Sequence, residues 1–314
     1  MKNAFVFPGQ GSQFVGMGKE LADNFSSARE VFEEVDNNLN QSLFNLMTTG
    51  PEYELTMTAN AQPALMAVSM AVVRVLEKDF GINMKDKATF VAGHSLGEYS
   101  AACAGGVFSL ADTARLLRTR GDAMQKAVPL GVGGMAAVIG LSFNDVNSLI
   151  EACVEGDKIC VAANDNSEGQ VVISGHVEAI EKAVEIAAEF GAKRCIKLSV
   201  SAPFHSPLMQ PAAEVMARVF MEVEAKKSNI PLISNVTVLP TTDEKEIIKN
   251  LIEQVTGSVR WRETIDYMHQ NGITDIYELG AGKVLSGLIK RNYKDINTAS
   301  IYSCEEIEEL AKNL

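Results

Sequence analysis

Short apolar runs alternate with longer segments of helical periodicity in the first and last parts of the chain. The apolar runs have the length of buried strands and lie at residues 3–7, 89–92, 230–234 and 275–278. Strands that alternate with helices are typical of a parallel sheet covered by helices on both faces. The pattern therefore predicts an α/β fold with a hydrolase-like parallel sheet core.

The middle of the chain has a different order of elements. Strand patterns lie at residues 135–139, 159–163, 171–174 and 194–198, and helical patterns lie at 144–153 and 177–190. A polar turn at 164–169 separates the two central strands. This is the β-α-β-β-α-β order of a ferredoxin-like unit. Prolines and glycines mark both of its ends, so we expect an inserted subdomain at 129–201 and a core at 1–128 plus 202–314.

The composition narrows the class of protein. A chain of 314 residues, 46% hydrophobic and 22% charged, can bury a large core. Its apolar stretches are interrupted short of the ~18 residues of a membrane helix, and its N-terminal apolar run is too brief for a signal peptide. The five cysteines form no C-x-x-C pair, which favours free thiols in a reducing cytoplasm over disulfides or zinc. A net charge of −12 argues against nucleic acid as a partner.

The segment Gly93-His94-Ser95-Leu96-Gly97 has the G-x-S-x-G form of a nucleophile elbow. An apolar run precedes it and a good helix-forming segment follows it, which is the strand-turn-helix context that this motif requires. The alternative is a buried structural serine in a glycine-rich turn. Because the context matches, we interpret Ser95 as a nucleophile at a helix N-terminus, where free N–H groups favour an oxyanion.

A serine hydroxyl needs a base to remove its proton. Of the four histidines, His94 is directed away from Ser95 by the sharp turn, and His176 and His269 lie near helix ends. His205 lies in a proline-bounded loop at the predicted subdomain boundary, so we expect it to be the base, the alternative being a structural loop histidine. No acid between the serine and His205 has a strand-end context, which favours a dyad whose imidazole is oriented by a backbone carbonyl or an amide.

Arg120 stands on the apolar stripe of a helix predicted from residue 110 to about 128. Leu117 and Met124 flank it on this stripe, whereas Arg115 and Arg118 lie off it. A buried guanidinium needs an anionic partner. That partner is either a protein carboxylate in a structural salt bridge or the carboxylate of a substrate, held by a bidentate fork.

A glycine-rich loop, residues 7–13, follows the first predicted strand. Its exposed backbone N–H groups would supply a second oxyanion donor beside the N–H of Leu96. The loop lacks G-x-G-x-x-G spacing, and the chain has no G-x-x-x-x-G-K-[ST] segment. A dinucleotide site and a Walker-type phosphate loop are therefore not expected.

Over nearly its whole length the sequence resembles one family, the malonyl-CoA:acyl carrier protein transacylases of type II fatty acid synthesis. The order and spacing of the matching motifs make the resemblance specific, although each motif alone is modest evidence. The motifs are Phe7-Pro8-Gly9-Gln10-Gly11-Ser12-Gln13, Gln62-Pro63-Ala64, Gly93-His94-Ser95-Leu96-Gly97-Glu98, Arg120-Gly121 with Met124-Gln125, Asn164 with Gly169-Gln170-Val171-Val172, Pro203-Phe204-His205-Ser206-Pro207-Leu208-Met209 and Glu278-Leu279-Gly280-Ala281-Gly282-Lys283-Val284-Leu285.

The resemblance implies roles for the residues of the reaction centre. Ser95 would be the acylated nucleophile and His205 its base. The backbone N–H groups of Gln10 and Leu96 would form the oxyanion hole.

The resemblance also implies how the substrate and the imidazole are held. Arg120 would pair with the malonyl carboxylate, and Gln62 and Phe204 would belong to the substrate-binding residues. A main-chain carbonyl just before a tryptophan steadies the imidazole in this family, which here indicates the carbonyl of Arg260 before Trp261.

The implied partners are malonyl-CoA and, transiently, holo acyl carrier protein, with no bound cofactor beyond the CoA thioester substrate. Carrier proteins of this type are acidic, and so is this chain, so docking requires a local basic patch. Arg194, Lys290 and Arg291 are candidates for it, with ordinary solvated surface charge as the alternative. We expect a monomer located in the cytoplasm, with no membrane partner.

Three other functions stay open. A serine hydrolase, such as a thioesterase, would have a third, acidic triad member and would not need Arg120. A discrete trans-acting polyketide acyltransferase would share the same motifs. A non-catalytic carrier-binding module would keep the fold, but intact Ser95, His205 and Arg120 argue against it.

Overall fold

Two sheets organise the chain in the computed structural model, which describes residues 2–200 and 202–314. The larger sheet has the strand order β10-β9-β1-β2-β7-β8. All of its neighbouring strands run parallel except the β7/β8 pair. The strands are β1 (Asn3–Phe7), β2 (Ala88–Gly93), β7 (Leu232–Ile233), β8 (Pro240–Thr241), β9 (Asp275–Leu279) and β10 (Asn297–Ile301). This is the parallel-dominated α/β sheet that the sequence predicts.

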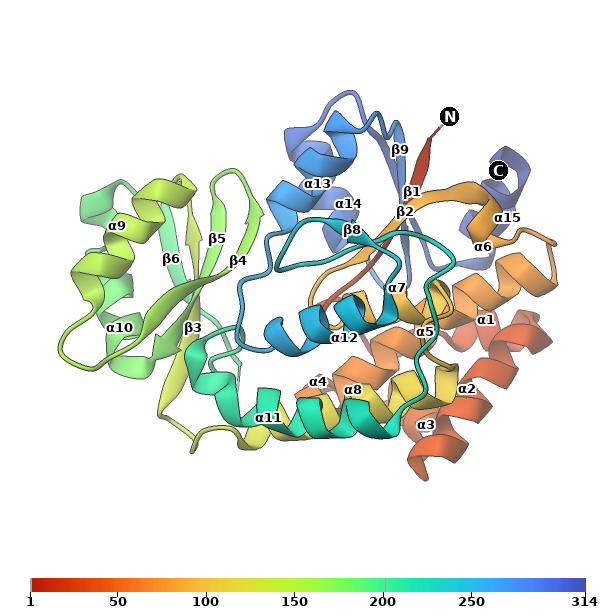
Figure 1. Ribbon diagram of the computed structural model, residues 1–314, viewed down its shortest axis with the longest axis horizontal. Helices are drawn as coiled ribbons and strands as arrows, with labels where there is room; N and C mark the ends of the chain where they lie inside the picture. The colour runs from red at the N-terminus through yellow and green to blue at the C-terminus, as the bar shows by residue number, and fades with distance from the viewer. Residues whose placement is uncertain (1, 201) are drawn as a thin grey trace.

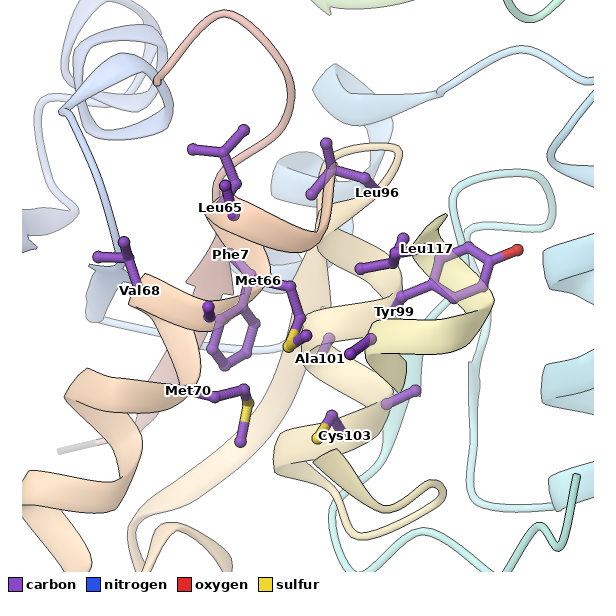
Figure 2. Close-up of a cluster of buried hydrophobic side chains, with 14 of the residues drawn as sticks. Phe7, Leu65, Met66, Val68, Met70, Leu96, Tyr99, Ala101, Cys103 and Leu117 are labelled. Carbon is purple, nitrogen blue, oxygen red and sulfur yellow. The ribbon is translucent and has the colours of Figure 1, made fainter. Parts of the chain in front are cut away.

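Helices cover both faces of this sheet, and the alternation of side chains along β1 shows the two layers. Phe5 and Phe7 face one buried cluster, whereas Ala4 and Val6 face the other. The first cluster contains residues of α5 (Thr58–Lys78), α7 (Gly97–Ala104) and α8 (Leu110–Lys126), and Figure 2 shows part of it around Phe7. The second contains residues of α13 (Trp261–Gln270) and α14 (Val284–Asn292).

Further helices complete the first layer (Figure 1). These are α1 (Lys19–Asn24), α2 (Ser26–Leu39), α3 (Leu43–Thr49), α4 (Glu52–Thr56), α6 (Met84–Lys87), α11 (Gln210–Val219), α12 (Glu244–Glu253) and α15 (Cys304–Asn313), with 3-10 turns at Pro207–Met209 and Phe220–Glu222. Helix α5 is the one described helix whose length and hydropathy would suit a membrane span, but 83% of that window is buried inside the protein. We therefore assign it to the core.

The second sheet is smaller and lies to one side of the first, at the left of Figure 1. Its strands are β3 (Gly133–Ile139), β4 (Cys160–Ser167), β5 (Gln170–His176) and β6 (Arg194–Lys197), all antiparallel, in the order β4-β5-β3-β6. Helices α9 (Phe143–Cys153) and α10 (Val177–Ile186), the latter followed by a 3-10 turn at Ala187–Phe190, complete the predicted element order. The predicted boundary at residue 201 lies outside the described residues.

The polar turn predicted at 164–169 is wrong, because β4 continues through Ser167. Its polar end is bonded to the segment before α13: the Val259 N–H donates to the Ala163 carbonyl at 2.8 Å, and the Asp165 N–H donates to the Val259 carbonyl at 2.9 Å. A buried Asp165 carboxylate also pairs with Arg262 of α13 at 2.8 Å. The edge of the smaller sheet is thereby attached to the core.

Candidate active site

Ser95 lies in the sharp turn between β2 and α7, with a φ of 54° in the left-handed region. The flanking glycines allow this turn because they have no side chain. A Cβ at Gly93 would lie 1.9 Å from the Gly97 carbonyl carbon, and a Cβ at Gly97 would lie 2.2 Å from the Phe7 carbonyl oxygen. The turn therefore holds the serine in a strained conformation above the carboxyl end of β2.

His205 completes a dyad with the serine. Its Nε2 lies 2.7 Å from Ser95 Oγ, and its Nδ1 lies 2.9 Å from the Gln254 carbonyl oxygen and 3.2 Å from that of Gly257. Two carbonyl acceptors require a proton on Nδ1, so Nε2 is free to accept the serine proton. No described carboxylate bonds to this imidazole, and the second acceptor comes from the segment that pairs with β4.

The prediction that the Arg260 carbonyl orients the imidazole is wrong. Arg260 is the residue before the first turn of α13, and its carbonyl accepts the Thr264 N–H at 3.0 Å and the Thr264 hydroxyl at 3.0 Å. Helix geometry directs this carbonyl along the helix axis, away from the imidazole. The acceptors that His205 uses, Gln254 and Gly257, lie a few residues earlier.

Burial controls the protonation of His205. The residue is 4% exposed, and burial, followed by the positive charge of Arg120, lowers the pKa of the imidazole to about 3. The imidazole is therefore neutral at physiological pH, which is the form in which it can act as a general base.

Arg120 is 1% exposed and is directed at the nucleophile. Its guanidinium donates to the side-chain oxygens of Gln62 and Gln254, each at 2.8 Å, and to Ser95 Oγ at 3.1 Å. Among residues 2–200 and 202–314 it forms no ion pair with a carboxylate. A structural salt bridge, the alternative that the sequence left open, is therefore absent from the described chain.

The two predicted oxyanion donors belong to two segments near the serine. Leu96 begins the first turn of α7, directly after the nucleophile. Gln10 lies in the loop after β1, and its side-chain oxygen accepts the Thr58 hydroxyl at 2.9 Å. Neither backbone N–H has an acceptor in the described part of the chain, so both are available to a ligand oxygen.

A cavity of about 350 Å³ contains the dyad and the arginine. It lies between the smaller sheet and the core, since Met135, Asn164, Asn166 and Val172 come from the strands of that sheet. The core contributes Gln10, Gln62, His94, Ser95, Arg120, Met124, Phe204 and His205. A larger cavity of about 520 Å³ between α14, β10 and α15 contains none of the predicted reaction-centre residues.

Two amide side chains that sequence reasoning missed support the elbow. Asn235 accepts the Ser95 N–H at 2.8 Å and donates to the Gly93 carbonyl at 2.7 Å. Gln254 donates to the Ser95 carbonyl at 2.9 Å. Neither has a recognisable sequence signal, because amides are common in loops and these two lie 140 and 159 residues from the serine.

His94 is not part of the dyad. This agrees with the expectation that the sharp turn directs its side chain away from Ser95. Its Nε2 lies 2.7 Å from Asn166 Oδ1 on β4, and burial lowers the pKa of its imidazole. The neutral ring joins the elbow to the smaller sheet. Asn166 was not singled out from the sequence, where it fell in the predicted turn.

Two of the three candidate docking residues lie at one end of the smaller sheet. Arg291 donates to the side chain of Gln170 on β5 at 3.2 Å, and Arg194 on β6 stands in the same cross-strand row, with Ile139 of β3 between the two strands. Lys290 lies on the other side of α14, in the larger cavity. The structure thus brings two of the three residues to one end of the smaller sheet.

A comparison with protein families shows to which family the chain belongs. The family model described as "Acyl transferase domain" matches residues 4–307. The chain belongs to the acyl transferase family. Its match covers both sheets and every residue of the dyad and the arginine site.

Known members of this acyl transferase family are similar over their whole length. The malonyl CoA-acyl carrier protein transacylase of Bacillus subtilis (strain 168) is 44% identical over 307 residues, covering 98% of this chain and 95% of the relative. A crystal structure of the acyl-carrier-protein S-malonyltransferase of Bartonella henselae is 55% identical, with a TM-score of 0.97 and coverage of 100% and 99%. A complex described as a holo type II polyketide acyl carrier protein with its malonyl-transacylase is 38% identical, with a TM-score of 0.96 and full coverage of both chains.

Proposed function

We propose that the protein transfers the malonyl group of malonyl-CoA to the phosphopantetheine thiol of holo acyl carrier protein, through a malonyl-serine intermediate. The observation that carries this proposal is the buried guanidinium of Arg120, which bonds to amides and a hydroxyl and lies 3.1 Å from the nucleophile. This guanidinium lies beside the serine that accepts the acyl group, and no carboxylate of the described residues pairs with it. It is therefore suited to bind an acyl group that carries its own carboxylate.

The reaction follows from the positions of four groups. His205 Nε2 takes the Ser95 proton as the oxygen attacks the thioester carbonyl, and the N–H groups of Gln10 and Leu96 hold the resulting oxyanion. The tetrahedral adduct collapses with loss of CoA, which leaves as the thiol with the proton from His205. The carrier thiol then gives its proton to the imidazole, attacks the malonyl-serine ester and regenerates the serine hydroxyl.

The arrangement of the dyad argues against a serine hydrolase. A hydrolase triad has a carboxylate on the far side of the imidazole, whereas His205 Nδ1 donates to two backbone carbonyls. A hydrolase also has no use for Arg120. An enzyme that supplies polyketide synthesis would use the same chemistry as one that supplies fatty acid synthesis. The two enzymes would differ only in which holo carrier protein accepts the malonyl group.

We assign the core, residues 1–128 plus 202–314, to a hydrolase-like sheet and residues 129–201 to an inserted ferredoxin-like subdomain. The support is the elbow at the end of a central parallel strand and the β-α-β-β-α-β order of the smaller unit, whose first strand β3 lies between the third and fourth. Limited proteolysis at the two connections would test these boundaries, with cleavage expected near residues 129–132 and 199–202.

We further propose that the enzyme works as a cytoplasmic monomer without a bound cofactor, and that the carrier protein docks at Arg194, Lys290 and Arg291. The support for a carrier partner is the similar solved complex with a holo carrier protein. The support for docking here is that all three side chains are exposed and that Arg194 and Arg291 lie at one end of the smaller sheet, which supplies part of the cavity wall.

Intact-protein mass after mixing with malonyl-CoA, acetyl-CoA or methylmalonyl-CoA tests the central proposal. We expect a malonyl adduct on the wild type, none on Ser95→Ala, and an adduct on Arg120→Ala that has lost its preference for malonyl over acetyl. Holo acyl carrier protein should discharge the wild-type adduct. CoA release without an adduct would indicate a hydrolase and would contradict the proposal.

A further inference from the structure

Glu98 is a fully buried carboxylate in the first turn of α7, three residues after the nucleophile. Its Oε2 accepts the Asn235 N–H at 3.2 Å and the side-chain amide of Gln254 at 2.7 Å. A buried acid is costly unless its hydrogen bonds serve the fold or the site. The reaction mechanism above assigns no role to it.

The two residues that Glu98 holds are those that hold the elbow. Asn235 bonds to the N–H of Ser95, and Gln254 bonds to its carbonyl. Both peptide groups of the nucleophile therefore bond to the side-chain amides of two residues that share one carboxylate oxygen of Glu98 as an acceptor.

Gln254 also connects the other two members of the site. Its backbone carbonyl accepts the His205 Nδ1 proton at 2.9 Å, and its side-chain oxygen accepts from Arg120 at 2.8 Å. One residue thus contacts the nucleophile, the base and the substrate-facing cation. A rotation of its side-chain amide would break the hydrogen bonds to both the Arg120 guanidinium and the Ser95 carbonyl.

Only one orientation of the Gln254 amide satisfies its neighbours. The guanidinium of Arg120 can only donate, so it requires the amide oxygen. The Glu98 Oε2 that faces this amide is an acceptor, also for the Asn235 N–H, so it requires the amide nitrogen on the opposite side. Without an acceptor at position 98, only the Ser95 carbonyl would hold the NH₂ group on this side, and a turn of that group toward the guanidinium would leave buried donors unsatisfied.

We propose that Glu98 is a positioning residue that selects the orientation of Gln254 and thereby fixes Arg120 for the carboxylate of the acyl group. It contacts no substrate atom and acts through the amide. The inference rests on the proposed malonyl transfer and adds a residue to it. Burial raises the pKa of the Glu98 carboxyl to about 7, with the Gln254 and Asn235 hydrogen bonds opposing this rise.

The test compares Glu98→Leu with Glu98→Gln, in the full-length enzyme. Leucine has similar bulk and no acceptor, whereas glutamine offers a carbonyl oxygen in nearly the same position. We expect Glu98→Leu to lower the malonyl-over-acetyl ratio of serine acylation rates about tenfold or more, mainly through a higher KM for malonyl-CoA. Glu98→Gln should restore most of that ratio.

Asp275→Asn is the matched control for loss of a buried carboxylate. Asp275 is 5% exposed, accepts from Asn297 at 3.0 Å, and lies at the amino end of β9, at the opposite edge of the sheet from the elbow. We expect this variant to lower the melting temperature without changing the malonyl-over-acetyl ratio.

A double variant tests whether Glu98 acts through the amide. In a Gln254→Met background the amide is already absent, so adding Glu98→Leu should change the ratio by less than about twofold. Three outcomes would overturn the inference. They are an equal loss of acylation rate with malonyl-CoA and acetyl-CoA, no rescue of the ratio by Glu98→Gln, and additive effects in the double variant. Failure of the wild type to form a malonyl adduct would instead overturn the proposed function.

Discussion

Arg120 lies beside the acyl site, and its positive charge also lowers the pKa of His205. Burial is the larger cause of the low imidazole pKa and the arginine charge is the next. The acid limb of kcat/KM, which reports the free enzyme, should therefore lie well below the ordinary histidine value of about 6.5. In Arg120→Gln the second cause is removed, the pKa of His205 rises, and the limb should move to higher pH.

The measurement is the pH dependence of serine acylation by acetyl-CoA, which lacks the carboxylate and serves both forms of the enzyme. An acid limb at the same pH in wild type and Arg120→Gln would contradict the assigned cause. A shift toward lower pH would contradict its sign.

Gly97 is one of two glycines, with Gly93, at which the elbow tolerates no side chain. A Cβ there would lie 2.2 Å from a backbone oxygen of β1, which cannot move without displacing the strand. We expect Gly97→Ala to destabilise the protein by about 3 kcal/mol or more, measured by urea unfolding. Gly287→Ala is the control, since its Cβ would meet nothing within 4 Å inside α14, and it should stabilise by about 0.5–1 kcal/mol. Equal effects of the two variants would refute this account.

At the scale of single residues, the sequence predicts the groups whose chemistry is unusual for their position. Ser95 stands in a motif with a strained turn, and Arg120 interrupts an apolar stripe; the structure brings both to His205. Gln254 could not be found in this way, because its contacts depend on a tertiary neighbourhood and not on local spacing. The error at Arg260 has the same origin, since only the helix start at Trp261 shows which carbonyls are free.

Among the elements, β4 connects the smaller sheet to the segment that holds the imidazole. It is the edge strand of the smaller sheet, and it pairs with the segment whose Gly257 carbonyl lies 3.2 Å from His205 Nδ1. The Asp165–Arg262 ion pair holds this junction from the α13 side. The position of the imidazole therefore depends on the docking of one sheet against the other.

Arg262→Met should loosen this junction by leaving the buried Asp165 carboxylate without its partner. We expect a loss of about 1–3 kcal/mol in unfolding free energy, faster hydrogen exchange at the Val259 and Asp165 amides, and a lower kcat. Lys158→Met, which removes an exposed pair with Glu178, should leave the unfolding free energy nearly unchanged and those amides protected. Unchanged exchange in Arg262→Met would show that the strand pairing alone holds the junction.

The element order of both sheets could be predicted because alternating buried strands and amphipathic helices leave a periodic pattern. The end of β4 could not, because Asn164, Asp165 and Asn166 are polar residues that usually mark a turn. In this fold their side chains bond to the core or line the cavity, and their backbone pairs with Val259. A polar strand that faces another part of the same chain has no local signature.

At the scale of the whole molecule, the net charge of −12 opposes an acidic partner while the proposed docking residues attract it. The two requirements are compatible only if the basic side chains are gathered near the cavity. Arg194 and Arg291 both lie at one end of the smaller sheet, with Gln170 and Ile139 between them, and this sheet also supplies part of the cavity wall. Acylation by CoA and discharge by the carrier protein should then respond differently to charge reversal.

The paired variant Arg194→Glu/Arg291→Glu should raise the KM for holo acyl carrier protein about tenfold or more, because like charges at an interface are repulsive and slow association. The rate of serine acylation by malonyl-CoA should change little, since neither residue lines the cavity. Lys19→Glu is the control: it makes a charge reversal in α1, at the far end of the molecule from the smaller sheet (Figure 1), and should leave both steps unchanged.

The measurement is carrier discharge of the malonyl enzyme at two salt concentrations. Because salt screens charge, the wild-type KM should rise with salt and approach that of the variant; an equal salt response in both proteins would place the docking surface elsewhere.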